Sequence, residues 1–123
     1  MNRYVKHIKE KNRYIEFLKV LNGNIHLTDR EIFTLALLIQ IDLDWKPLFE
    51  GDYKNVNSTD NRRSVMKEGR LSRHALSGFI RKFRDKGILV ENDEKGLEVD
   101  PLFIPSETGK IIEVVFTLDY GKN

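Results

Sequence analysis

The densest apolar pattern in the chain lies in residues 28–42 and predicts a helix. Thr28 and Glu31 have the spacing of a capping box, in which each side chain bonds the other residue's backbone N–H, so the helix is expected to begin at Thr28. Its apolar residues go nearly all round it: Ile32, Phe33, Leu35, Ala36, Leu37, Leu38, Ile39 and Ile41. Such a helix either lies at the centre of the core, which we favour, or gives one face to a second subunit, so a homodimer through helix 28–42 is left open.

A weaker apolar stripe precedes this helix. Residues 12–21 fit a helical period, and the Asn-Gly-Asn sequence that follows is expected to end the helix, with Gly23 in a left-handed cap. The first twelve residues are polar and basic, and they are expected to form an arm or a fraying helix. We therefore divide the chain into a basic N-terminal arm or helix at 1–24 and one domain at 25–123.

The polar stretch at 45–60 predicts a long loop, because it combines Pro, Gly and several Asn and Asp residues. A loop of this length in a compact domain indicates a function or an unrecognised short element. Its aromatic residues are expected to anchor it to the core. They are Trp45, Phe49 and Tyr53.

Two basic helices are predicted after the loop. The first is expected to run from Ser58 or Thr59 to Glu68 and to end at Gly69. The second is expected over residues 73–86, after a Ser72 N-cap, and to end at Gly87. At 100° per residue, the apolar residues of the second helix gather on one side, which is the inward face. They are Leu76, Phe79, Ile80 and Phe83.

The opposite face of helix 73–86 carries a different set of residues: His74, Ser77, Gly78, Arg81, Lys82 and Asp85. Glycine in a helix interior costs about 1 kcal/mol relative to alanine. An exposed Gly78 therefore indicates that a phosphate, a groove wall or another helix approaches the backbone closely. The alternative is a tolerated glycine with no role.

Apolar and polar residues alternate in the last third of the chain, as they do in β-strands. Residues 88–93 are apolar and then turn, and β-rich runs follow at 96–104 and 110–118. Pro101 and Pro105 confine their segment to an edge or bulged strand. The order of elements predicts an α+β fold with the helices first and a small antiparallel sheet after them.

Charge is distributed unevenly along this chain of net charge +2. Between residues 61 and 86 nine basic residues face only Glu68 and Asp85, a local balance of +7, and residues 1–19 form a second basic block. Such a local excess creates a positive potential that favours a nucleic-acid partner. An ordinary solvated helix face is the alternative interpretation.

The stretch LSRHALSGFIRKFRDKGIL resembles the recognition helix of winged helix-turn-helix regulators. Those proteins place a Ser after an apolar residue, apolar residues four, eight and eleven positions later, and then a basic residue, Gly and two apolar residues. The matching residues here are Leu71, Ser72, Leu76, Ile80, Phe83, Lys86, Gly87, Ile88 and Leu89. One departure is that Gly69 lies three residues before the Ser, with Arg70 inserted, where the family usually has Gly two residues before it.

The chain is also similar, more loosely, to small winged-helix proteins of bacterial viruses, in which FLKVLN precedes LTDREI and a segment like VDPLFIP follows the wing. The resemblance implies a winged helix-turn-helix fold. It also implies a DNA-binding protein of the transcriptional-regulator type, in which helix 72–86 enters the major groove of double-stranded DNA and the hairpin forms the wing. A regulator of this type is expected to be a dimer.

The expected DNA contacts fall into three groups. Around the N-terminus of the helix, Ser72, Arg73, His74 and Ser77 would face bases or the nearest phosphates, with Arg70 beside them and Gly78 allowing close approach. Arg62, Arg63, Arg81 and Lys82 would hold the phosphate backbone. Lys95, at the tip of the wing, would reach a neighbouring phosphate or the minor groove.

Enzyme chemistry has little support in the sequence. There is no Cys, and His7, His26 and His74 share no ligand spacing, so we expect no metal, no cofactor and no catalytic activity. Asp42 and Asp44 do not share a helix face and make a poor carboxylate pair. The start of the chain has no apolar run like a signal sequence, and the longest apolar stretch is about half a membrane span. We expect a cytoplasmic protein of a bacterial or phage-infected cell, without membrane association.

A second hypothesis uses the same fold as an adaptor or structural component that binds a protein partner, for example in a phage particle or a transcription assembly. The apolar excess of helix 28–42 and the aromatic loop motivate it. In that case the basic helix would be only the rim of the interface.

Overall fold

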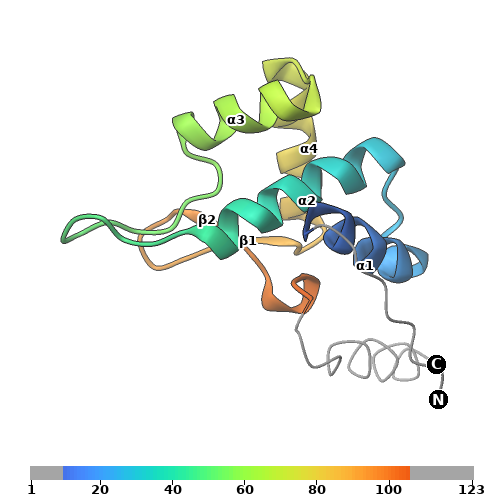
Figure 1. Cartoon of the computed structure of the whole chain (residues 1–123), viewed down its shortest axis with the longest axis horizontal. Coiled ribbons are helices and arrows are strands. Elements are labelled where there is room, and N and C mark those ends of the chain that lie inside the picture. Colours follow the sequence, from blue (N-terminus) through green and yellow to red (C-terminus); the bar gives the residue numbers. More distant parts are fainter. Residues whose placement is uncertain (1–9, 106–123) are drawn as a thin grey trace.

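A computed structural model of the chain describes residues 10–105 (Figure 1). The helices are α1 (Glu10–Ile25), α2 (Asp29–Asp44), α3 (Thr59–Gly69) and α4 (Arg73–Asp85). An antiparallel hairpin of β1 (Leu89–Glu91) and β2 (Leu97–Val99) follows, and then the short 3-10 helix η1 (Pro101–Phe103). The predicted α+β order, with helices first and a small antiparallel sheet after them, is confirmed for this part. Residues 1–9, which include His7 and the start of the basic block at 1–19, and the β-rich run at 110–118 lie outside the described residues.

Helix α2 is the centre of the core, as its apolar pattern predicts. It contacts α1, α3 and β2, and Ile32, Leu35 and Ile39 are fully buried. The capping box is present: the Glu31 N–H donates to Thr28 Oγ1 at 3.2 Å, and the Thr28 N–H donates to Glu31 Oε1 at 2.8 Å. The helix therefore begins where the sequence predicts and ends at Asp44, two residues beyond the predicted end.

Helix α1 corrects one prediction. Gly23 is not a left-handed cap, because the helix continues through it to the buried Ile25 and the left-handed residue is His26, with φ of 53°. The side chain of Asn22 explains the difference, since it accepts from the Leu27 N–H at 2.6 Å and donates to the Leu27 carbonyl at 3.0 Å. These two bonds fix the end of the helix at Ile25, two residues beyond Gly23.

Helices α3 and α4 form as predicted. The hydroxyls of Ser58 and Ser72 cap their first turns, and α4 buries Leu76, Ile80 and Phe83 while Phe79 is half-buried. At the end of α3 the left-handed residue is the inserted Arg70, with φ of 52°, and Gly69 is the last helical residue. Arg70 thus takes the conformation in which a glycine is usual.

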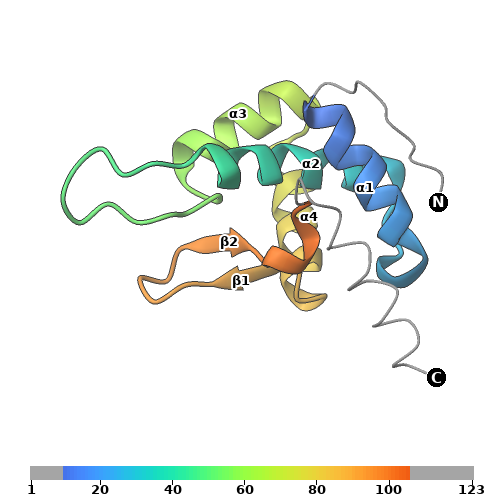
Figure 2. The ribbon, with the colours of Figure 1, turned by 60° about the horizontal axis from the view of Figure 1, so that its bottom comes forward.

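The long loop between α2 and α3 projects from the helices on the same side as the hairpin (Figures 1 and 2). The prediction that its aromatic residues anchor it is wrong for Phe49 and Tyr53, which are 75% and 46% exposed; only Trp45 is half-buried. Polar contacts hold the base of the loop. Lys54 Nζ lies 2.9 Å from the buried carboxylate of Asp42, whose other oxygen accepts from the Val99 N–H.

The hairpin pairs Leu89 with Val99 and Glu91 with Leu97, and it is braced against the base of the loop. The Val56 N–H donates to the Leu97 carbonyl at 2.9 Å, and Asn92 Nδ2 donates to the Lys54 carbonyl at 2.7 Å. The expected edge strand at Pro101 is instead the start of η1. Pro101 lacks the N–H that the first position of a helix leaves unbonded, and Asp100 caps the helix by accepting from the Leu102 N–H.

Candidate nucleic-acid interface

The outer face of α4 is exposed over its whole length. Arg73, His74, Ser77, Gly78 and Arg81 all lie on the surface. Among the residues that the structure describes, Arg73 and Arg81 have no ion-pair partner, so their charge is not neutralised by the fold. A Cβ placed on Gly78 would meet nothing within 4 Å, so the backbone there is open to solvent. This face therefore presents two cations that the described part of the fold does not neutralise, beside an open stretch of backbone.

The N-terminus of α4 has its own polar arrangement. The Ser72 hydroxyl accepts from the Ala75 N–H at 3.0 Å. It therefore acts as a helix cap, and its oxygen is already engaged in one hydrogen bond. The Arg70 carbonyl accepts from Arg30 Nη2 at 3.0 Å, which holds the turn before the cap. The side chains of Arg70 and Arg73 are exposed on either side of this end, where the helix dipole favours an anion.

An open groove of about 500 Å³ lies beside this face, between the start of α3 and α4. Its lining residues are Asn57, Arg62, Ser77, Ile80, Arg81, Arg84 and Asp85. Arg62 crosses between the helices, since its guanidinium donates to Asn57 Oδ1 at 2.8 Å and to Ser77 Oγ at 2.7 Å. Three guanidinium groups against one carboxylate make this groove cationic, and guanidinium forks match the oxygens of a phosphate.

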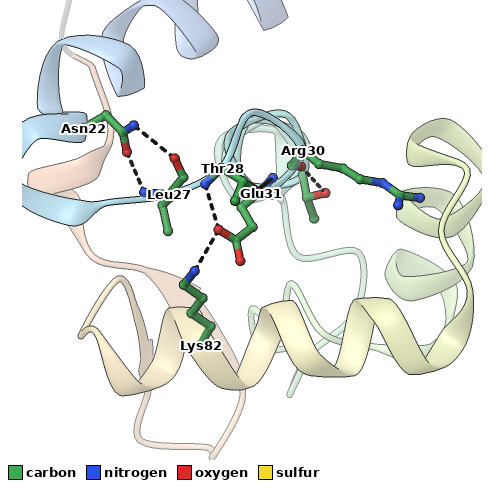
Figure 3. A network of polar contacts seen from close by, with 7 residues as sticks. Asn22, Leu27, Thr28, Arg30, Glu31 and Lys82 are labelled. Carbon is green, nitrogen blue, oxygen red and sulfur yellow. Dashed lines mark hydrogen bonds and ion pairs between the residues drawn. The ribbon is translucent and has the colours of Figure 1, made fainter.

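Lys82 does not join this surface. Its Nζ lies 2.9 Å from Glu31 Oε1, the same carboxylate that accepts from the Thr28 N–H (Figure 3). Burial by itself would raise the pKa of Glu31. The hydrogen bond from the Thr28 backbone and the Lys82 ammonium outweigh burial, so the pKa of Glu31 lies below its ordinary value. Lys82 therefore connects α4 to the start of α2 and is already engaged within the chain.

The other two predicted contact residues, Arg63 and Lys95, do not line the groove. Arg63 makes a loose 3.5 Å contact with Asp60, and both side chains are exposed, so the pair leaves Arg63 available. Lys95 is exposed at the hairpin turn, where it takes a φ of 65°, but it does not line the groove. The structure thus brings together Arg62, Ser77 and Arg81, whereas Lys95 stands apart.

Sequence reasoning missed two residues that line the groove. Arg84 follows Ser77 by seven residues and Arg81 by three, a spacing that puts it beside them on a helix, so the pattern could have indicated it. It also makes an exposed 3.4 Å contact with Glu91. Asn57 belongs to the loop and has no signal in the sequence, because its position depends on how the loop returns to α3.

Within residues 10–105 no group of three or more His, Asp or Glu side chains is arranged to hold a metal ion. None of the helices in this range has the length and apolar character needed to cross a membrane. No protein-family profile, curated protein or solved structure matches the chain.

Proposed function

We propose that this chain is a non-enzymatic DNA-binding protein of the winged-helix type, in which α4 enters the major groove and the β1–β2 hairpin is the wing. The observation that carries the proposal is the continuous cationic surface formed by the outer face of α4 and the groove beside it. Arg73 and Arg81 have exposed, unneutralised charges on this surface, and Asp85 is the only acidic residue that lines the groove. An α-helix with this charge pattern fits the width of the major groove.

The proposed contacts are of two kinds: contacts that read the bases and contacts that bind the phosphate backbone. Arg73, His74 and Ser77, in the first half of α4, would meet base edges or the nearest phosphates, and the open backbone at Gly78 would let the groove wall approach. Arg62, Arg81 and Arg84 would bind phosphates along the groove. Lys95 would touch the backbone from the wing. Lys82 is left out of the contact set because of its ion pair with Glu31.

A binding titration tests the proposal. Fluorescence anisotropy would follow a labelled random-sequence duplex at low salt with the wild-type chain, with the double variant Arg73→Ala/Arg81→Ala, and with the matched variant Lys19→Ala/Lys46→Ala. Both variants lose two exposed positive charges, but Lys19 and Lys46 lie on α1 and the loop. The proposal predicts that the wild type binds and that the α4 variant binds at least roughly tenfold more weakly than the control. Equal weakening in both variants contradicts it.

The second candidate is an adaptor that binds a protein partner, for example as a structural component of a phage particle. The exposed apolar tip of the loop at Leu48 and Phe49 favours this alternative. It predicts that the wild type does not bind duplex DNA even at low salt, where any cationic contact with phosphate is strongest. The same titration therefore separates the two functions.

A further inference from the structure

The tip of the loop between α2 and α3 presents large apolar side chains to solvent. Leu48 is 81% exposed and Phe49 is 75% exposed, and Tyr53 beside them is nearly half exposed. Single exposed apolar residues are common on protein surfaces, but two adjacent ones at the end of a projecting loop form an apolar knob. We call Leu48 and Phe49 the loop tip.

Hydrogen bonds within the loop hold this tip in place. One oxygen of the Asp52 carboxylate accepts from the Leu48 N–H at 2.9 Å and from the Phe49 N–H at 2.8 Å, and the Asp52 N–H donates back to the Phe49 carbonyl at 3.1 Å. Gly51 closes the turn with a φ of 91°. At the base, Lys54 is bound to Asp42 and its carbonyl to Asn92. An apolar anchor held rigidly in advance loses little conformational entropy when it binds.

The charges near the tip argue against a phosphate partner. Glu50 and Asp52 flank the tip, whereas the ammonium of Lys54 is occupied by the buried Asp42 carboxylate. Lys46 is then the one cation of the loop's outer part. A nucleic-acid backbone or an anionic lipid surface would be repelled by the two carboxylates, so the tip fits an apolar protein surface.

A surface of that kind is present on the same chain. An open, mainly apolar groove of about 350 Å³ lies between α2 and α3. Its lining residues are Leu37, Gln40, Ile41, Ser64, Val65 and Glu68. Leu37 and Ile41 are only partly covered, although they belong to the otherwise buried α2. The exposed carboxylate of Glu68 at this groove also complements Lys46, two residues before the tip.

We propose that the loop tip of one copy inserts into the α2–α3 groove of a second copy, so that two chains form a dimer by reciprocal exchange. A knob and a complementary groove on one chain can be paired twice about a two-fold axis, which closes the assembly at two copies. The groove uses partly covered residues of α2, the helix at which the sequence left a homodimer contact open. It does not depend on DNA binding.

Sedimentation velocity of the full chain over a concentration series tests the exchange. Three variants are compared with the wild type: Phe49→Ser removes the knob, Ser64→Arg fills the groove from an exposed helical position, and Val20→Ser is the control, since Val20 is exposed on α1. The wild type and the control should dimerise, and the first two variants should dissociate at least roughly tenfold more readily. Circular dichroism checks that each variant is folded.

Mixing the two defective variants gives the sharper result. The Phe49→Ser chain keeps an intact groove and the Ser64→Arg chain keeps an intact tip, so their mixture can restore one of the two contacts. The mixture should therefore associate more strongly than either variant alone. A monomeric wild type, a dimer that both variants leave intact, or a mixture no better than its components overturns the proposal.

Discussion

Lys82 of α4 and Glu31 of α2 lie 51 residues apart in the sequence and are joined by a 2.9 Å ion pair between Nζ and Oε1 (Figure 3). The same Glu31 oxygen accepts from the Thr28 N–H, so one carboxylate both caps the central helix and pairs with α4. The buried Leu76, Ile80 and Phe83 hold α4 in the core, and the ion pair adds a polar contact between α4 and α2. The ion pair therefore supports the position of the proposed DNA interface without being one of its contacts.

The first prediction follows from the burial of Glu31. Lys82→Ala leaves that carboxylate buried without its cation, so the free energy of unfolding should fall by about 1–3 kcal/mol. Lys86→Ala, which removes an exposed lysine one residue past the end of α4, should change it by less than about 0.5 kcal/mol. Urea denaturation at neutral pH compares the two variants, and equal stabilities would show that the ion pair contributes nothing.

A pH dependence follows from the same residue. The pKa of Glu31 is lower in the folded chain than its ordinary value, so Glu31 contributes stability that is complete above that ordinary value. The contribution is lost as the pH falls through the folded pKa. Thermal unfolding between pH 7 and pH 3 should show that Glu31→Gln lowers the melting temperature at pH 7 and that the difference from the wild type shrinks on acidification. A difference that stays constant with pH contradicts the assignment.

Gly96 is expected to be intolerant of a side chain. A Cβ at this buried position in the hairpin would collide with the Lys54 carbonyl oxygen and press on Asn55 and Tyr53. Gly96→Ala should therefore separate the hairpin from the base of the loop and destabilise the fold by about 1–3 kcal/mol. Amide hydrogen exchange should be faster at Val56, whose N–H donates to the Leu97 carbonyl, and at Leu97, whose N–H donates to Asn55 Oδ1. Unchanged exchange there would rule out the collision.

Gly78 should behave in the opposite way. It lies inside α4 with open space around it, so Gly78→Ala should stabilise the fold by about 0.5–1 kcal/mol through the unfolded state. If the major-groove wall approaches the backbone there, the same variant should bind duplex DNA more weakly although it is more stable. Thermal unfolding and a DNA titration on one preparation separate these effects, and a more stable variant with unchanged affinity would exclude close approach.

Local signals in the sequence predicted most of the described helices well. The Thr28–Glu31 capping box and the cap at Ser72 depend on residues within three positions of each other, so spacing alone determines them. The end of α1 was mispredicted because the Asn22 side chain bonds both backbone groups of Leu27, and Gly23 is then not needed as a cap.

The pattern of apolar and polar residues could not predict features that depend on residues far apart in the sequence. A helical wheel places Lys82 on the outer face of α4, but its partner Glu31 comes from another helix. Phe49 looks like a core anchor by composition, whereas the turn closed by Asp52 holds it in solvent. The cationic groove requires Arg62 to reach Ser77 across two helices, a contact that helix packing decides.

The salt dependence of duplex binding tests the central proposal most directly. Binding constants for a random duplex would be measured between about 50 and 200 mM salt for the wild type, Arg81→Ala and the control Lys19→Ala, an exposed lysine on α1. If α4 and its groove bind phosphates, the logarithm of the wild-type binding constant should fall linearly with the logarithm of salt concentration. Arg81→Ala should reduce the slope by about 1, and Lys19→Ala should leave it unchanged. No measurable duplex binding at low salt, or the same slope and affinity for the wild type and Arg81→Ala, would contradict the proposed DNA-binding role of this surface.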